Sequence, residues 1–187
     1  MILYHGTIVP GIKQFRIGVT GKGELDTPVN CIWLTDTFAA AKTHALSFSK
    51  HRQNSTNAYI YEVEIACDAI VADTGKRKEI QSSVNKKIVC SHSGALSYLL
   101  GKHDWLSAIS YAVGDEGYVA SKNGMFEILL DAGVHLLANP AFDFETAKSK
   151  SKPNIFSNPG SGIDYALLDV TKATILNCTQ VCGKEPQ

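Results

Sequence analysis

The stretch IWLTDTFAAA, residues 32–41, joins two different hydrophobic patterns. It continues an apolar run at residues 31–34, which predicts a short strand. Asp36 or Thr37 can cap a helix, and the alanine-rich sequence predicts that helix over residues 38–50. A strand that leads directly into a helix indicates a fold in which both element types share one core.

The segments on either side of this stretch alternate between strand and helix patterns. Residues 59–65 alternate apolar and charged side chains over most of their length, as a half-buried strand does. Apolar residues at helical spacing predict helices at 96–113, with a break near Gly101 or Asp104, and at 126–137. Shorter apolar runs, each a candidate strand, lie at residues 2–4, 70–72, 165–168 and 173–176. Short strands, several helices and long loops together predict an α+β fold.

Polar stretches at residues 10–30, 76–87 and 148–162 separate these elements and are predicted to be loops or solvated segments. The glycines near residue 20 read GVTGKG, which matches neither the dinucleotide fingerprint nor the P-loop. A Rossmann fold and a nucleotide triphosphatase are therefore not expected.

Length and composition restrict the class of protein. The 187 residues, 44% of them hydrophobic, are enough for one domain over residues 1–187 with a real core. The formal net charge is zero, whereas a non-specific nucleic-acid binder carries a basic excess. No basic leader precedes the first apolar residues, and no apolar run approaches the ~20 residues of a membrane span. We therefore expect a cytoplasmic protein with no membrane partner.

The cysteines predict neither a disulfide framework nor a metal site. There are five, an odd and scattered set, which favours a reducing compartment. Cys178 and Cys182 form one C-x3-C pair, but zinc needs four ligands and there is no second close pair of cysteines, although Cys90 and His92 could in principle contribute. We expect no metal.

Three separated segments carry, in chain order, a histidine, an aromatic residue and an acid. They are LYHGT (residues 3–7), IWLTDTFAAA (residues 32–41) and IDYALLD (residues 163–169). In this order they resemble the ADP-ribosyltransferase family, and within it the diphtheria-toxin-like branch that includes the poly(ADP-ribose) polymerases. The rifampin-modifying ADP-ribosyltransferases are the nearest in pattern. The resemblance implies split mixed β-sheets around an NAD cleft, flanked by helices, and leaves residues 66–160 as a poorly matched, partly helical insertion.

The first segment supplies the residues that the resemblance assigns to the two ends of NAD. His5 would hydrogen-bond the adenosine ribose, and the Gly6 backbone would hold the nicotinamide carboxamide, with Thr7 beside them. A glycine lets the backbone approach a planar ligand closely, and an imidazole offers a directed donor and acceptor.

The other two segments supply the stacking residues and the acid. Trp33 stands where the family usually has tyrosine and would stack on the nicotinamide, with Thr35 contributing to the same cofactor site. His44 falls at a second stacking position. Asp164 would be the catalytic acid, alongside His5 and Trp33. Departures from the polymerase pattern at Ala41 and His44 favour transfer of a single ADP-ribose unit.

Each of these residues also has an ordinary structural interpretation. His5 could be a packed histidine, Trp33 a core residue, and Asp164 simply the start of a strand. Glu116 and Glu127 are alternative acids, although neither begins an apolar strand.

The sequence therefore predicts an NAD-dependent mono-ADP-ribosyltransferase, a glycosyltransferase that uses NAD as substrate. Its acceptor would be a protein, a nucleic acid or a small molecule. An intracellular toxin or phage–host conflict effector, with an inhibitory partner protein, would suit such a chain. Two alternatives stay open: an NAD glycohydrolase on the same site, and an inactive domain that binds ADP-ribose or a partner. The chain's three arginines, Arg16, Arg52 and Arg77, are too few to favour an RNA 2′-phosphotransferase.

Overall fold

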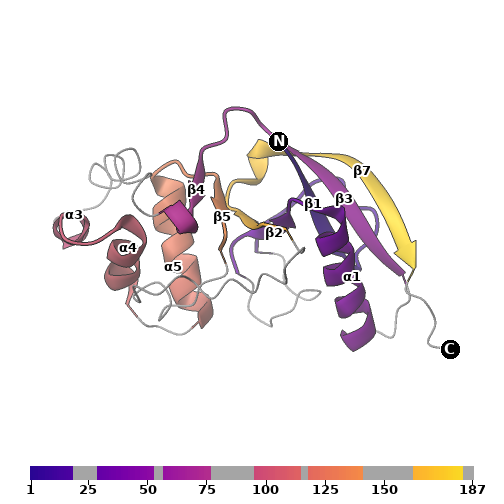
Figure 1. The fold of residues 1–187 in the computed structure, drawn as a ribbon, viewed down its shortest axis with the longest axis horizontal. Coiled ribbons are helices and arrows are strands. Elements are labelled where there is room, and N and C mark those ends of the chain that lie inside the picture. The colour runs from indigo at the N-terminus through magenta and orange to yellow at the C-terminus, as the bar shows by residue number, and fades with distance from the viewer. Residues whose placement is uncertain (19–28, 53–56, 77–94, 115–117, 141–161, 183–187) are drawn as a thin grey trace.

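Seven strands form one hydrogen-bonded sheet in the computed structural model (Figure 1). The structure describes residues 1–18, 29–52, 57–76, 95–114, 118–140 and 162–182. The strands are β1 (Ile2–Thr7), β2 (Ile32–Thr35), β3 (Asn57–Ile65), β4 (Val71–Asp73), β5 (Leu136–Ala138), β6 (Asp164–Leu167) and β7 (Ala173–Cys182). Their order is β4-β5-β6-β2-β1-β3-β7, with only β4 and β5 parallel among neighbours. This mixed sheet, with helices beside it, confirms the α+β class.

The expected division into split sheets is not what the hydrogen bonds show. β1 and β2 join the two parts of the sheet at one register pair, Tyr4 opposite Thr35. By contrast, β1 pairs with β3 along its whole length. The sheet is therefore continuous but narrow at its middle, where β1 and β2 diverge.

All six strands predicted from the sequence are present, with shifted ends. The largest change is in β7, which runs to Cys182 because it pairs along β3 as far as Asn57. β5 was missed: the helical pattern predicted over residues 126–137 continues only to Asp131. Gly133, at φ +80°, lies just beyond the helix, and the apolar residues after it are buried in a strand. A short apolar run fits either element type by periodicity alone.

The α-helices among the described residues are α1 (Phe38–Arg52), α3 (Ala95–Leu100), α4 (Trp105–Val113) and α5 (Tyr118–Asp131), and short 3-10 helices lie at Thr74–Lys76 and Val170–Lys172. The predicted break within residues 96–113 is confirmed: Asp104 caps α4 by accepting a hydrogen bond from the Ser107 backbone N–H at 3.0 Å. α1 lies beside β1 and β3, whereas α4 and α5 gather at the other end of the sheet (Figure 1). Among the described residues, no helix combines the length and hydrophobicity needed to cross a bilayer.

Two apolar clusters occupy opposite sides of the sheet, since side chains alternate along each strand. One packs α3, α4 and α5 against residues such as Trp33 and Ala166. The other contains Leu3, Leu34 and Tyr61. The described residues between 66 and 140 include β4, β5, α3, α4 and α5, and therefore supply part of the same sheet and core.

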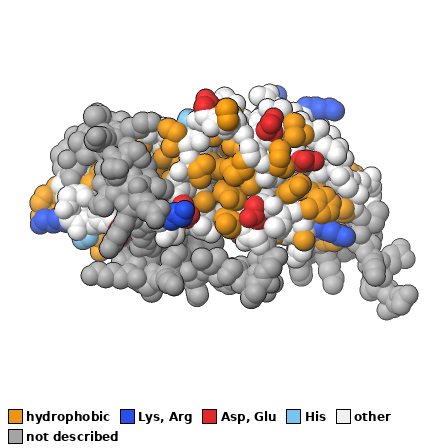
Figure 2. Space-filling model, turned by 45° about the horizontal axis from the view of Figure 1, so that its top comes forward, with side chains coloured by type: hydrophobic (Ala, Val, Ile, Leu, Met, Phe, Trp, Pro, Cys, Tyr) orange, Lys and Arg blue, Asp and Glu red, His pale blue; other side chains and the backbone are white. Residues whose placement is uncertain are grey.

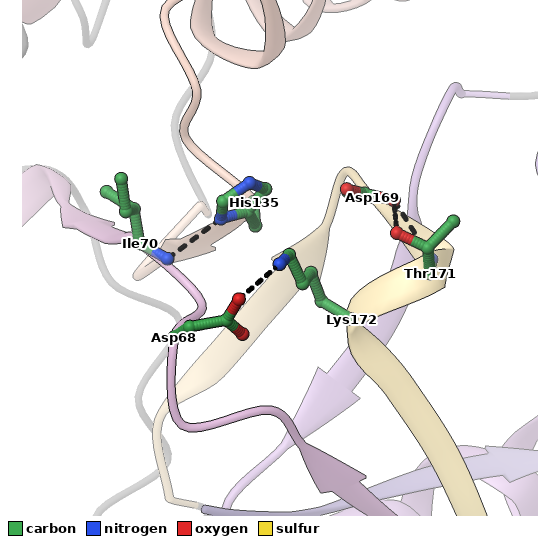
Figure 3. Close-up of polar contacts among 6 residues, drawn as sticks. All are labelled: Asp68, Ile70, His135, Asp169, Thr171 and Lys172. Carbon is green, nitrogen blue, oxygen red and sulfur yellow. Dashed lines mark hydrogen bonds and ion pairs between the residues drawn. The ribbon is translucent and has the colours of Figure 1, made fainter.

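Polar contacts join the segment before β4 to the residues just before β5 and just after β6 (Figure 3). His135 Nδ1 accepts a hydrogen bond from the Ile70 backbone N–H at 2.9 Å, and the His135 carbonyl accepts one from Leu168 at 2.9 Å. Lys172 and Asp68 form an ion pair at 2.7 Å across the same corner. Backbone pairing with β4 and β6 holds β5 in place, and Asn139, just after β5, reaches Asp164.

Apolar side chains also reach the surface. Figure 2 shows them gathered across the middle of one face, with acidic side chains near them. The predicted loops at residues 76–87 and 148–162, and the glycines Gly21 and Gly23, lie almost entirely outside the described residues.

Candidate functional site

A row of side chains crosses three strands at the narrow middle of the sheet. Tyr4 of β1 is opposite Thr35 of β2, and Thr35 is opposite Asp164 of β6. Residues directly opposite in a sheet lie on the same face, as do residues two apart in one strand, so Gly6 and Trp33 share this face. The divergence of β1 and β2 opens a cavity of about 140 Å³ here. Its described lining residues are Tyr4, Gly6, Trp33, Leu34, Thr35, Ala40, Ala41, His44 and Asp164.

The cavity brings together five of the seven predicted site residues, from three distant segments. Gly6, Trp33, Thr35, His44 and Asp164 all line it. His5 and Thr7 are not among its described lining residues. Because they alternate with Gly6 along β1, their side chains project from the other face.

Gly6 has a packing role that the sequence did not reveal. A Cβ at this position would lie 2.0 Å from the Ala41 carbonyl oxygen of α1, far inside contact distance. The glycine therefore lets α1 approach β1 closely. That approach places Ala41 and His44 over the cavity.

Thr35 lines the cavity and has a buried hydroxyl. The residue is only 6% exposed, and its Oγ1 has no hydrogen-bond partner among the described residues. A buried hydroxyl without a partner costs about 1–3 kcal/mol, so such groups are usually satisfied by a ligand or by water. Thr35 is therefore a candidate ligand contact.

Asp164 begins β6 at the cavity, and its backbone is fixed from the neighbouring strand. Its carbonyl accepts a hydrogen bond from Asn139 N–H at 2.9 Å. Asn139 has a positive φ of 54°, and its side-chain amide donates to Asp73 Oδ1 at 2.8 Å. Asparagine tolerates this left-handed conformation better than most residues. The β5 end thus holds the acid in register with Thr35.

The environment of Asp164 weakens its acidity. Although the side chain as a whole is exposed, partial desolvation of the carboxyl group raises its pKa. The negative charge of Asp36 raises the pKa further, whereas His44 lowers it. The carboxyl group is therefore better suited than a fully solvated one to exchange a proton.

Trp33 belongs to both the core and the cavity. It packs partly buried against the cluster beneath α3, α4 and α5. Lys122 of α5 holds its Nζ 5.4 Å from the centre of the indole ring, within the range of a cation–π contact. Trp33 is therefore both a core residue and a residue that lines the cavity.

His5 bridges the gap where β1 and β2 separate. Its Nδ1 lies 2.8 Å from the Trp33 carbonyl oxygen. Because a carbonyl can only accept, Nδ1 carries the hydrogen and Nε2 of the neutral ring is an acceptor. Burial against Phe15 and Tyr61 lowers the pKa of His5 to about 4; the bond to Trp33 opposes this shift, and His44 adds to it.

Thr7 acts locally: its Oγ1 accepts a hydrogen bond from the Val9 backbone N–H at 3.3 Å. Sequence reasoning also missed Tyr4, which lines the cavity and contacts the Phe38 ring edge-on at 5.9 Å. Its position two residues before Gly6 was the available signal. Among the described residues, no three His, Cys, Asp or Glu side chains are placed to hold a metal ion.

Comparisons of the chain with known protein families, with curated proteins and with solved structures gave no match.

Proposed function

We propose that the chain is a mono-ADP-ribosyltransferase whose cavity receives the nicotinamide end of NAD. The observation that carries this proposal is the convergence of Gly6, Trp33 and Asp164, which come from three separate segments, on one cavity. Its volume of about 140 Å³ suits one small aromatic ring. The match between a motif order in the sequence and a shared cavity in the fold supports the assignment.

The chemistry at the cavity follows from the position of Asp164. Cleavage of the bond between nicotinamide and ribose develops positive charge on the ribose. A carboxylate beside that ribose stabilises the charge, and it can also hydrogen-bond the 2′-hydroxyl or orient the incoming nucleophile. The raised pKa of Asp164 lets it accept the proton of an acceptor hydroxyl or amine more readily.

The nicotinamide would be held by the remaining lining residues. The Trp33 indole offers a flat face, the Thr35 hydroxyl offers a hydrogen bond to the carboxamide, and His44 closes the cavity from α1. The close packing of α1 at Gly6 keeps the cavity narrow. Nicotinamide can then leave as a neutral ring from a fixed position.

The family resemblance assigns the adenosine ribose to His5, whose side chain projects from the face of the sheet opposite the cavity. With Nδ1 bound to the Trp33 carbonyl, Nε2 can accept a hydrogen bond from a ribose hydroxyl. His5 would therefore bind NAD and also fix the strand that carries Trp33.

We expect Thr35→Val to have opposite effects on the free protein and on NAD binding. Valine keeps the shape but removes the unpaired hydroxyl, so the free energy of unfolding without ligand should rise by about 1 kcal/mol. NAD affinity should fall about tenfold because the carboxamide loses a partner. Urea denaturation and NAD titration measure the two effects. A variant that binds NAD as wild type does would remove Thr35 from the site.

One observation favours NAD hydrolysis as a second candidate function. The Asp164 side chain is exposed, so water can reach the reacting ribose from the open side of the cavity. An inactive domain that binds ADP-ribose or a protein partner would instead agree with the departures from the family pattern at Trp33 and His44.

The purified chain incubated with NAD and a cell lysate tests these functions together. Nicotinamide release with labelled ADP-ribose on protein or nucleic acid is the expected result and identifies the acceptor class. Release without transfer to macromolecules would favour hydrolysis or a small-molecule acceptor. Binding of NAD or ADP-ribose without turnover would favour the inactive domain, and the absence of both would overturn the proposal.

A further inference from the structure

Asp36 and Ile163, each next to a residue that lines the cavity, are joined by two hydrogen bonds beyond the ends of their strands. The Asp36 backbone N–H, just after β2, donates to the Ile163 carbonyl at 3.1 Å. The Ile163 N–H, just before β6, donates to the Asp36 carboxylate Oδ1 at 2.8 Å. Together they extend the pairing of Thr35 with Asp164 by one residue. The side chain of Asp36 thus replaces a backbone acceptor at the point where the strand ends.

This use of Asp36 differs from the helix cap that its sequence position also allowed. The cap of α1 is Thr37, whose Oγ1 accepts a hydrogen bond from the Ala40 N–H at 3.2 Å. The Asp36 carboxylate instead accepts from the segment that leads into β6. A charged acceptor makes a stronger bond than a neutral one, which suits an anchor at the end of two paired strands.

Gly162 completes this contact. Its φ of +87° lies in the left-handed region that favours glycine, and a Cβ there would lie 2.1 Å from Asp36 Oδ1 and 2.9 Å from Thr37 Cγ2. Any larger residue would push the carboxylate away from the Ile163 N–H. The sequence Gly162-Ile163-Asp164 is therefore shaped to receive Asp36.

We propose that Asp36, seated against Gly162, is a positioning residue that clamps the start of β6 and fixes the Asp164 carboxyl group at the cavity. The catalytic consequence of this clamp rests on the proposed function. Asp164 is two residues from Gly162, so loss of the clamp frees the acid on one side while Asn139 still holds the other. Small displacements of a reacting group can lower rates by about 10²-fold.

The Asp36 carboxylate also places a negative charge near Asp164. Asp36 raises the pKa of Asp164, in the same direction as partial desolvation, and His44 on α1 opposes both. Burial raises the pKa of the neighbouring Tyr165, and the negative charges of Asp36 and of Asp73, at the end of β4, raise it further. Position and charge can be separated, because asparagine keeps the acceptor oxygen of Asp36 and removes its charge.

Four variants test the clamp: Asp36→Asn, Asp36→Ala, Gly162→Ala and, as a control with an equal change of net charge, Asp131→Asn. Asp131 is exposed at the end of α5 and does not line the cavity. Amide hydrogen exchange at Ile163, with Val63 of β3 as the internal reference for folding, reports the clamp without requiring activity. NMR titration of the Asp164 carboxyl group reports the charge. Steady-state kinetics with NAD give kcat and KM, which report whether the Asp164 carboxyl group is correctly positioned.

We expect Asp36→Ala and Gly162→Ala to lose protection at Ile163 and to lower kcat about 10- to 100-fold with a smaller change in KM. Asp36→Asn should retain the protection, lower the pKa of Asp164, move the acid limb of the rate profile to lower pH and keep a higher kcat than Asp36→Ala. Asp131→Asn should match wild type.

Retained protection at Ile163 in both Asp36→Ala and Gly162→Ala would overturn the clamp, as would an unchanged kcat in both. If the wild-type chain releases no nicotinamide, the proposed function fails. Hydrogen exchange at Ile163 and the titration of Asp164 would still show whether Asp36 holds the start of β6.

Discussion

Asp164→Asn is expected to lower nicotinamide release from NAD by about 10²–10³-fold, equivalent to about 2.7–4 kcal/mol of transition-state stabilisation. The amide keeps the size and most hydrogen-bonding capacity of the side chain but cannot carry the negative charge that offsets the developing positive charge on the ribose. NAD affinity should stay within about threefold of wild type, because that charge acts mainly in the transition state. Single-turnover kinetics and NAD titration measure the two quantities separately.

Glu127→Gln provides the matched control for this loss. Glu127 was the alternative acid in the described part of the chain, and the structure places it on α5, exposed and outside the residues that line the cavity. The variant changes the charge by the same amount and should keep the wild-type rate. If the loss appeared in Glu127→Gln instead, or if Asp164→Asn kept full rate, the acid would be misassigned.

The candidate site residues could be predicted from the sequence where a pattern of apolar residues marks a strand. Gly6 follows a short apolar run, Trp33 lies within one and Asp164 precedes one, and pairing of these segments places all three on one face. The predicted loss of helix near Asp104 was also right, because a capping residue follows a glycine there. In both cases local chemistry and tertiary structure agree.

The remaining features depend on neighbours that no local pattern specifies. The strand at Leu136 has the apolar spacing of the helix before it, and only pairing with β4 and β6 decides its conformation. Asp36 is an ordinary cap candidate in sequence, and its contact with Ile163 spans 127 positions along the chain. Gly6 reads as a ligand-contact glycine, while the structure adds its packing against Ala41. Long-range contacts of this kind follow from the fold rather than from the segment.

The position of the His5 side chain also could not be predicted from the local sequence. A histidine next to a glycine in a strand predicts a ligand contact, but strand alternation places consecutive side chains on opposite faces. Its bond to the Trp33 carbonyl makes it a structural link across the gap between β1 and β2 as well as a candidate NAD contact. The structural role can be tested by changing the pH, because the folded protein holds the His5 ring in its neutral form.

Lowering the pH from 7.5 to 4.5 should therefore destabilise the wild-type protein through His5. Burial lowers the pKa of His5 from 6.5 to about 4, so the unfolded chain binds a proton in a range where the folded chain does not. The associated stability is complete above pH 6.5 and is lost as the pH falls towards 4. The shift is equivalent to about 3 kcal/mol at most, because His5 as a residue is only partly buried. Urea denaturation at each pH gives the free energy of unfolding.

His5→Asn and His5→Phe do not titrate in this range, so both should lose less stability between pH 7.5 and 4.5 than wild type does. Asparagine can still donate a hydrogen bond to the Trp33 carbonyl and should be the more stable of the two at pH 7.5. The difference in stability between the two variants at pH 7.5 measures this hydrogen bond, whereas NAD affinity should fall in both variants because neither supplies the Nε2 acceptor in the same place. Variants that follow the wild-type pH dependence would show that His5 is accessible to protons in the folded state. In that case the neutral ring, and with it the fixed acceptor proposed for the ribose, would have to be abandoned.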